Sequence, residues 1–198
     1  DLYKNNKVEY NYFYKDISGW NTSSIVDMSG LFQNDTLFNV DISGWNTQNV
    51  TNMSNMFNGA STFNKPIGKW NVSKVKNMYN MFQSSPFNQD ISSWNVSKVK
   101  NMSNMFQSSQ YNFDLSWNVS NVTNMGAMFQ SSQFNKDINS WNVSNVTNMS
   151  YMFINSPFNR NISNWDVSKV VNMQSMFHGA TNFNSDISGW NVSKVVNM

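Results

Sequence analysis

The sequence predicts a solenoid, a stack of about eight similar coils of 24 or 25 residues each. Its tryptophans recur at nearly constant intervals, at Trp20, Trp45, Trp70, Trp94, Trp117, Trp141, Trp165 and Trp190. A valine or isoleucine follows each tryptophan by five residues, and a methionine follows it by eight. All 14 methionines fall in two such rows, and phenylalanine follows the second row directly. These three regularities assign every large apolar residue type to a fixed place in the repeat.

A coil of this length cannot bury its apolar residues by itself, so neighbouring coils are expected to stack and bury equivalent residues against each other. We therefore interpret residues 1–198 as a single repeat domain. Residues 1–12, which are rich in tyrosine, form an atypical N-terminal segment or cap. Residues 13–198 hold the repeats, the last of which is incomplete, and this favours a portion of a longer protein.

The first half of each coil is predicted to contain a short β-strand. In the fourth copy, Ile91, Trp94 and Val96 approximate the alternation and β-branched character of a strand. Equivalent strands of successive coils would then form a narrow parallel sheet along one side of the stack.

The second half of each coil is predicted to form a short helical or 3-10 turn. From Val99 the apolar spacing becomes i, i+3, i+6, i+7 and ends at Phe106, with Ser97 as the N-cap. A second short extended piece over residues 99–102 is the alternative. The copy around residues 111–115 has lost one residue, so its coil is expected to be strained.

Two rows of side chains are interpreted as structural ladders. One is the tryptophan row, and the other is an asparagine row directly before the first methionine. An amide at a fixed bend can satisfy backbone groups of its own coil and of the next one. The asparagine row consists of Asn52, Asn77, Asn101, Asn124, Asn148 and Asn172.

The composition excludes several classes of function. Asparagine supplies 37 residues, charged residues make up only 12%, and the net charge is +2, so no nucleic-acid partner is expected. Cysteine is absent, which removes disulfides and thiolate chemistry. No apolar run is long enough for membrane insertion, and no signal peptide is visible in this segment.

An enzyme is not expected, and neither is a cofactor or a resident metal. The only histidine, His178, is interpreted as a solvated surface residue. A row of aspartates precedes the tryptophans by four residues at Asp16, Asp41, Asp90, Asp137 and Asp186. Such a row could hold calcium between coils, but Pro66 and Asn161 interrupt it, so turn-capping is the preferred interpretation.

The one candidate patch for a ligand is basic. Lys74, Lys76, Lys98 and Lys100 occupy the fourth and sixth positions after tryptophan in two adjacent copies. Such a patch is either a solvated face or a surface that binds anions or glycans.

The pattern FNxDISxWNVSxVxNMxxMFxxS resembles the tandem repeats of mycoplasma-type bacterial surface lipoproteins, which are usually grouped with BspA-like leucine-rich-repeat surface proteins. The resemblance implies a leucine-rich-repeat-like fold, an extracellular or surface-exposed location, and adhesion through a protein or glycan on another surface. A purely structural component of a cell-surface or virion assembly, self-associating through the sides or ends of the stack, is the alternative.

Overall fold

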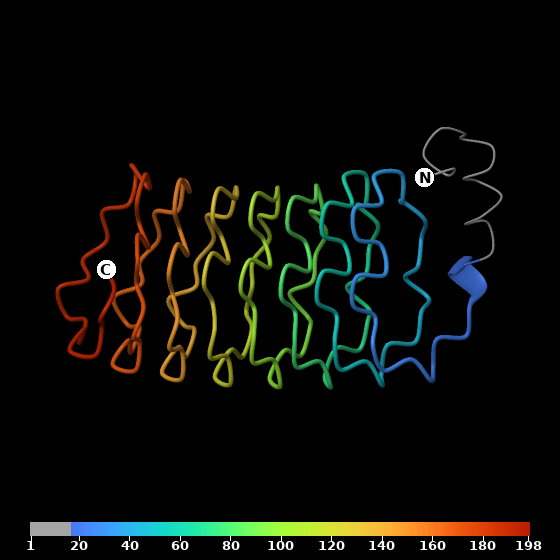
Figure 1. Ribbon diagram of the computed structural model, residues 1–198, viewed down its shortest axis with the longest axis horizontal. Coiled ribbons are helices and arrows are strands. Elements are labelled where there is room, and N and C mark those ends of the chain that lie inside the picture. Colours follow the sequence, from blue (N-terminus) through green and yellow to red (C-terminus); the bar gives the residue numbers. More distant parts are fainter. Residues whose placement is uncertain (1–16) are drawn as a thin grey trace.

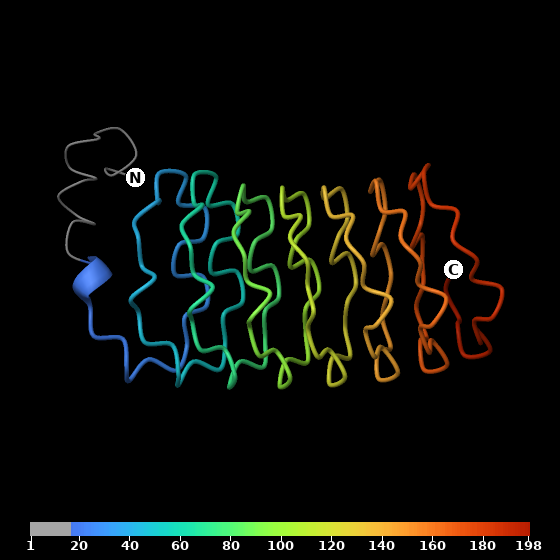
Figure 2. The same cartoon turned by 180° about the vertical axis from the view of Figure 1, so that it is seen from behind.

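The computed structural model describes residues 17–198. Its coils lie side by side in sequence order along one axis, and the blue and red ends of the described chain lie at opposite ends of that axis (Figures 1 and 2). The segment 1–12, which was predicted to form a cap, lies outside the described residues, as does Asp16.

The predicted fold class is wrong. Within residues 17–198 there is one helix, the 3-10 helix η1 at Ile17–Gly19, and there is no β-strand and no sheet. The segments expected to be strand and helical turn are successive tight turns in every coil. Adjacent coils are joined by isolated parallel bridges of one residue each. Residues 17–198 therefore form a stack of turn-built coils and lack the parallel sheet of a leucine-rich-repeat-like solenoid.

The reason lies in the backbone hydrogen bonds that cross between coils. The N–H groups of Met53, Asn55, Phe57 and Gly59, which are every second residue, donate to carbonyls of the following coil at 2.8 to 3.0 Å. The same alternation recurs along the stack. In a helix, these N–H groups would donate to carbonyls of the same segment, four residues earlier. Because they donate to the following coil instead, the expected helical turn does not form.

The intervening residues close turns inside the coil. Met56 donates its N–H to the carbonyl of Met53 (3.3 Å), and Ala60 donates to Phe57 (3.1 Å). Two residues per coil, such as Asn55 (φ 57°) and Gly59 (φ 69°), adopt left-handed backbone conformations. Strands require negative φ throughout, so these residues curl the chain between one inter-coil bond and the next. Side chains at i, i+3 and i+7 still point inward, which is why the apolar spacing imitated a helix.

The bridges run along the predicted asparagine row. They join Asp27, Asn52, Asn77, Asn101, Asn124, Asn148, Asn172 and Asn197 in one parallel series. Asn101 lies within residues 99–102, the range proposed for a second extended piece, but the extended pairing there is a single residue. Turns at residues 97–98 and from Ser103 onward limit the bridge to one residue, while hydrogen bonds to the neighbouring coils continue on both sides of it.

Aromatic rings fill the interior in continuous ladders. Phe57 lies 5.7 Å from Phe82 of the next coil with an interplanar angle of 3°, and 3.9 Å from Phe63 of its own coil. Both contacts are stacked geometries that add to the free energy of simple burial. Methionine side chains pack between the rings and are almost completely buried from Met53 to Met152. Each coil therefore supplies one layer of a single core.

The tryptophans form a second ladder, which also carries hydrogen bonds. Trp45 and Trp70 stack at 6.5 Å with an angle of 4°. From Trp45 to Trp190, every indole Nε1 donates to the carbonyl of the isoleucine or leucine that stands two or three residues before the tryptophan of the preceding coil, at 2.8 to 3.3 Å. A buried indole N–H needs such a partner. The tryptophan row thus holds each coil in register with the one before it.

The shortened coil keeps its place in these ladders. Leu115 lies two residues before Trp117, so the turn that other coils close over three residues is shortened here. Even so, Trp117 donates from Nε1 to Ile91 at 3.1 Å, and the Leu115 carbonyl accepts the indole N–H of Trp141 at 2.9 Å. The missing residue is accommodated on the surface, where Phe113 is 39% exposed.

This coil also contains a buried hydroxyl that has no hydrogen-bond partner. Tyr111 occupies a position that is phenylalanine in the neighbouring coils, and its side chain is fully buried. Burial raises the pKa of the Tyr111 hydroxyl far above its ordinary value, and the charge of Asp90 adds to the effect. The backbone N–H of Ile91 lies near enough to the hydroxyl to lower its pKa slightly, but no hydrogen bond of good geometry forms. The hydroxyl is therefore neutral and has lost its hydration without a full replacement.

We expect Tyr111→Phe to raise the free energy of unfolding by about 1 to 2 kcal/mol, because it removes a buried polar group without a partner. Urea denaturation followed by circular dichroism measures the change. Tyr79→Phe is the control, because Tyr79 is 36% exposed and its replacement should change stability by less than about 0.5 kcal/mol. A loss of stability in Tyr111→Phe would show that the hydroxyl has a partner.

Candidate functional site

The predicted asparagine row lies at the bridges and closes a turn in each coil. The side-chain Oδ1 of Asn52 accepts the N–H of Ser54 (3.1 Å), and Asn101 accepts that of Ser103 (3.0 Å). Some members also bond along the row, as when Asn148 donates from Nδ2 to Oδ1 of Asn124 at 3.1 Å. These amides are occupied in holding the backbone. The row consists of turn residues, and its side chains are committed within the fold.

A second asparagine ladder was missed in the sequence. From Phe38 onward an asparagine follows each aromatic residue that opens a copy, and the Oδ1 of each asparagine from Asn39 to Asn159 accepts the backbone N–H of the equivalent asparagine one coil later at 2.9 to 3.3 Å. The repeated Phe-Asn or Tyr-Asn pair was the signal that could have revealed it. The members are Asn39, Asn64, Asn88, Asn112, Asn135, Asn159 and Asn184.

The aspartate row closes turns of the same kind. Asp41 accepts the N–H of Ser43 (2.9 Å), and Asp90 accepts that of Ser92 (2.8 Å). Hydrogen bonds from these serines lower the pKa of both carboxyl groups. Asn161 replaces aspartate without loss of the turn, since its Oδ1 accepts the N–H of Ser163 at 2.9 Å. Residues 17–198 contain no cluster of three or more metal-binding side chains.

The predicted lysine patch lies on the side of the stack, with all four side chains exposed. Lys76 and Lys100 are direct neighbours in the backbone ladder, since Lys100 N–H donates to the Lys76 carbonyl at 2.8 Å. Lys76, Lys98 and Lys100, together with Asn121, line a shallow hollow of about 220 Å³. The structure thus brings three of the four lysines together around one depression.

The fourth lysine is held away from this hollow. Lys74 donates from Nζ to Oδ1 of Asn49 in the preceding coil at 2.7 Å. Lys169 makes the same contact with Asn145 at 2.7 Å. The equivalent residue one coil before Lys98 is Lys74, whereas an asparagine precedes Lys74 and Lys169 in this way. No hydrogen-bond partner of the Lys98 side chain is found within residues 17–198.

The lysines form the centre of a longer polar surface, which we call the side strip. It consists of two parallel rows at the fourth and sixth positions after tryptophan. Within residues 17–198, neither row contains a carboxylate or an aromatic side chain over these five coils. The first row is Asn49, Lys74, Lys98, Asn121 and Asn145, and the second is Thr51, Lys76, Lys100, Thr123 and Thr147.

Backbone hydrogen bonds keep the side strip straight. Each residue of its second row donates its N–H to the carbonyl of the equivalent residue one coil earlier, at 2.8 to 2.9 Å. The hydroxyl groups of Thr123 and Thr147 also donate along the row, to Lys100 (3.2 Å) and Thr123 (3.1 Å). The strip is a rigid surface with one set of polar side chains per coil.

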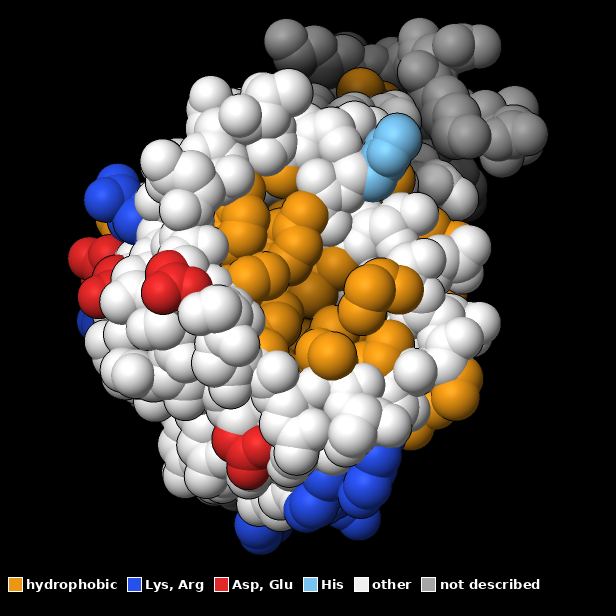
Figure 3. Space-filling view, turned by 90° about the vertical axis from the view of Figure 1, so that its left-hand side faces the viewer, with side chains coloured by type: hydrophobic (Ala, Val, Ile, Leu, Met, Phe, Trp, Pro, Cys, Tyr) orange, Lys and Arg blue, Asp and Glu red, His pale blue; other side chains and the backbone are white. Residues whose placement is uncertain are grey.

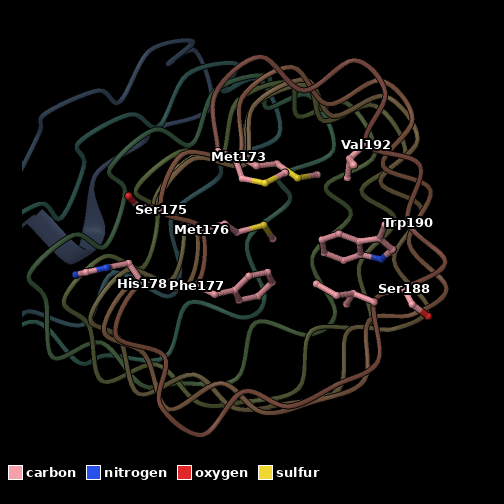
Figure 4. Close-up of a pocket in the computed structure, with 10 residues that line it drawn as sticks. Met173, Ser175, Met176, Phe177, His178, Ser188, Trp190 and Val192 are labelled. Atoms are coloured by element: carbon pink, nitrogen blue, oxygen red, sulfur yellow. The ribbon is translucent and has the colours of Figure 1, made fainter.

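The two ends of the described stack expose apolar residues of the interior ladders. At the C-terminal end a hollow of about 420 Å³ is lined by residues that include Met173, Met176, Phe177 and Trp190. Figure 3 shows these apolar side chains in the centre of the end face, within a polar rim. In Figure 4 Phe177 and Trp190 point toward each other across the hollow, whereas His178 points away from it. His178 is an exposed residue at its edge.

A similar hollow of about 300 Å³ lies at the other end and is lined by residues that include Trp20, Ile25, Leu31 and Trp45. Trp20, the first tryptophan of the ladder, is 57% exposed. Within residues 17–198, each hollow lies in a layer of the core that has a neighbouring coil on one side only.

The coils, ladders and side strip define a tandem-repeat protein whose core is one continuous stack. More particularly, the chain belongs to the family described as Mycoplasma protein of unknown function, DUF285, which matches residues 2–116 and again 112–198. The mycoplasma-type resemblance is confirmed at this level, and the match does not extend to the BspA-like leucine-rich-repeat group. No curated protein and no solved structure matches the chain. Among residues 17–198 no helix has the length and apolar character required to cross a membrane.

Proposed function

We propose that the protein is a non-enzymatic, surface-exposed repeat module that binds proteins or glycans through the side of the coil stack, in the manner of adhesive surface proteins. The side strip is the observation that supports this role. It places amide, hydroxyl and ammonium groups, all exposed or half-buried, at the same two positions of five successive coils. The surface location and the adhesive role that the resemblance to BspA-like proteins implies are part of this proposal. The leucine-rich-repeat fold of those proteins is not part of it.

The spacing of the strip suits many weak and similar contacts. Neighbouring coils joined by such bridges lie about 4.8 Å apart, so an extended partner that follows the stack meets an equivalent polar group in every coil. Contacts that are individually weak then add through effective concentration. Between Phe38 and Phe158, most of the apolar and aromatic side chains of the kind that usually dominate compact binding sites are directed into the core, and Tyr79 and Phe113 are the exposed exceptions among the large ones.

The experiment is binding of the folded protein to a mixed array of neutral and acidic glycans and to cultured cells. A blocked variant, Thr51→Tyr/Thr147→Tyr, places bulk on the side strip, and binding should fall strongly. Gly44→Tyr/Gly189→Tyr is the matched control, because both glycines have open space around them and lie outside the strip. Equal binding by both variants, or no binding by the parent protein, would contradict the proposal.

The second candidate is a structural component that associates through the ends of the stack, and it rests on the apolar end layers of residues 17–198. Their hydrogen-bonding groups are complementary, because inside the stack the N–H groups of one coil meet the carbonyls of the next. Copies joined head to tail would extend without closing. Light scattering should then show a mass that rises with concentration and falls in Val192→Lys. A constant monomer mass would exclude this candidate.

A further inference from the structure

We propose that the hollow formed by Lys76, Lys98, Lys100 and Asn121 binds the sulfate or carboxylate groups of an acidic oligosaccharide lying along the side strip. This inference rests on the proposed side-binding function and names its ligand class. It is carried by the arrangement of charge in the patch and by the chemistry of the residues on either side.

The patch collects positive charge without compensation. Lys76 and Lys100 are adjacent in one row, and Lys74 and Lys98 are adjacent in the other. Like charges directly opposite each other on neighbouring extended segments are destabilising. None of the four lysines has a carboxylate partner within residues 17–198. An anion between the rows would relieve this repulsion.

Lys98 and Lys76 are the two lysines of the hollow whose ammonium groups have no hydrogen-bond partner within residues 17–198, so they are best placed to bind such an anion. The Nζ of Lys74 donates to Asn49, and the Nζ of Lys100 donates to Oδ1 of Asn121 at 3.4 Å. Asn121 is itself fixed, because its Nδ2 donates to the carbonyl of Ser97 at 2.8 Å. One wall of the hollow is thus held in place, and the ammonium group of Lys98 has no competing partner. A ligand oxyanion can be that partner.

The flanking residues indicate a sugar chain. On both sides of the lysines the first row continues with asparagine and the second with threonine. The Thr123 and Thr147 hydroxyls donate to the backbone, so their oxygens stay available to accept hydrogen bonds from sugar hydroxyls. Each amide of the first row likewise keeps one N–H free, because Asn145 uses Nδ2 for a single bond to Ser120 at 2.8 Å.

A nucleic acid fits this surface less well. Single-stranded nucleic acids are bound by basic grooves combined with aromatic side chains on which the bases stack. The side strip has no aromatic residue, and the net charge of the protein is only +2. An acidic oligosaccharide needs a local cationic centre and neutral hydrogen-bonding neighbours, which the strip supplies.

The test is calorimetric titration with a fully sulfated heparin-type hexasaccharide and with its desulfated counterpart. We expect tighter binding of the sulfated form, because its desulfated counterpart keeps only the carboxylates, and added salt should weaken the binding of both. Lys98→Gln/Lys100→Gln should reduce the affinity about tenfold, since two exposed charge contacts are lost. Lys98→Arg/Lys100→Arg keeps both charges and should retain binding, which also shows that substitution at these sites leaves the fold intact.

Lys169→Gln/Lys194→Gln is the matched control. These lysines occupy the first-row position in two adjacent coils, but their second-row neighbours are Val171 and Val196. Removing them should change the affinity by less than twofold, although the net charge falls by the same amount. An equal loss in both variants would reduce the effect to overall charge and overturn the proposal.

Three further probes separate other ligands. Equal binding of a single-stranded DNA oligonucleotide or of poly-glutamate would overturn the glycan assignment. Inorganic sulfate that binds as tightly as the hexasaccharide would reduce the site to one for free anions, with the same consequence. If neutral glycans or proteins bind on the array and the sulfated hexasaccharide does not, this inference fails while the proposed side-binding function stands.

Discussion

Replacing Trp94 with alanine is expected to lower the free energy of unfolding by about 3 to 5 kcal/mol, the range for removing a large buried aromatic side chain. Trp94 is only 3% exposed, stacks on Trp117 at 6.4 Å and contacts Phe82 at the same distance. Its Nε1 also donates to the Ile67 carbonyl at 3.2 Å. The substitution therefore removes core volume and one bond that holds two coils in register.

Trp20 supplies the control for this prediction. It stands at the end of the same ladder and stacks on Trp45 at 6.4 Å, but 57% of its surface is exposed. Trp20→Ala should cost less than about 1.5 kcal/mol, because much of its apolar surface already lies in water. Chemical denaturation of the two variants makes the comparison. Equal losses would show that burial between coils contributes little to the stability of the stack.

Gly68→Ala is expected to lower the free energy of unfolding by about 1 to 3 kcal/mol, the usual range for overpacking. A Cβ atom at Gly68 would lie 2.5 Å from the backbone carbonyl oxygen of Asp90 in the next coil. Backbone cannot move aside as a flexible side chain can, so the two coils must separate locally. Gly68 follows Pro66 and Ile67, in the copy where proline replaces the turn-closing aspartate.

Gly44→Ala is the matched control, since no atom lies within 4 Å of a Cβ atom built at Gly44. Neither glycine requires a left-handed backbone, so the pair differs in the space available and not in strain. Thermal unfolding of both variants should show a lower melting temperature for Gly68→Ala alone. A similar shift in both variants would mean that the close contact between a Cβ atom at Gly68 and the Asp90 carbonyl does not lower stability.

The interior of the protein could be identified from the sequence, whereas its secondary structure could not. The spacing of tryptophan, valine, methionine and phenylalanine marks the rows that lie in the core, and the side chains of these rows between Phe38 and Val170 are almost completely buried. The same spacing predicted a strand and a helical turn, and both are absent from residues 17–198. Apolar periodicity reports which side chains point inward and does not report how the backbone connects them.

The candidate site was predicted in part. Lys74, Lys76, Lys98 and Lys100 were recognised as a patch because they fall at two positions of adjacent copies. The sequence could not show that Lys74 is directed to Asn49 while Lys98 has no partner, because that difference depends on which side chain lies one coil behind. The second asparagine ladder was visible as a repeated letter, but its bonds join residues about 24 positions apart.

The sequence by itself determined the length of the repeat, the order of the coils and the residue types that face the core. The tertiary structure alone decided where each backbone N–H is directed. At Asn55 and Gly59 the chain turns into left-handed conformations, and alternate N–H groups then meet carbonyls of the following coil. A single isolated copy has no such acceptors within it, so its backbone conformation depends on the coil stacked against it.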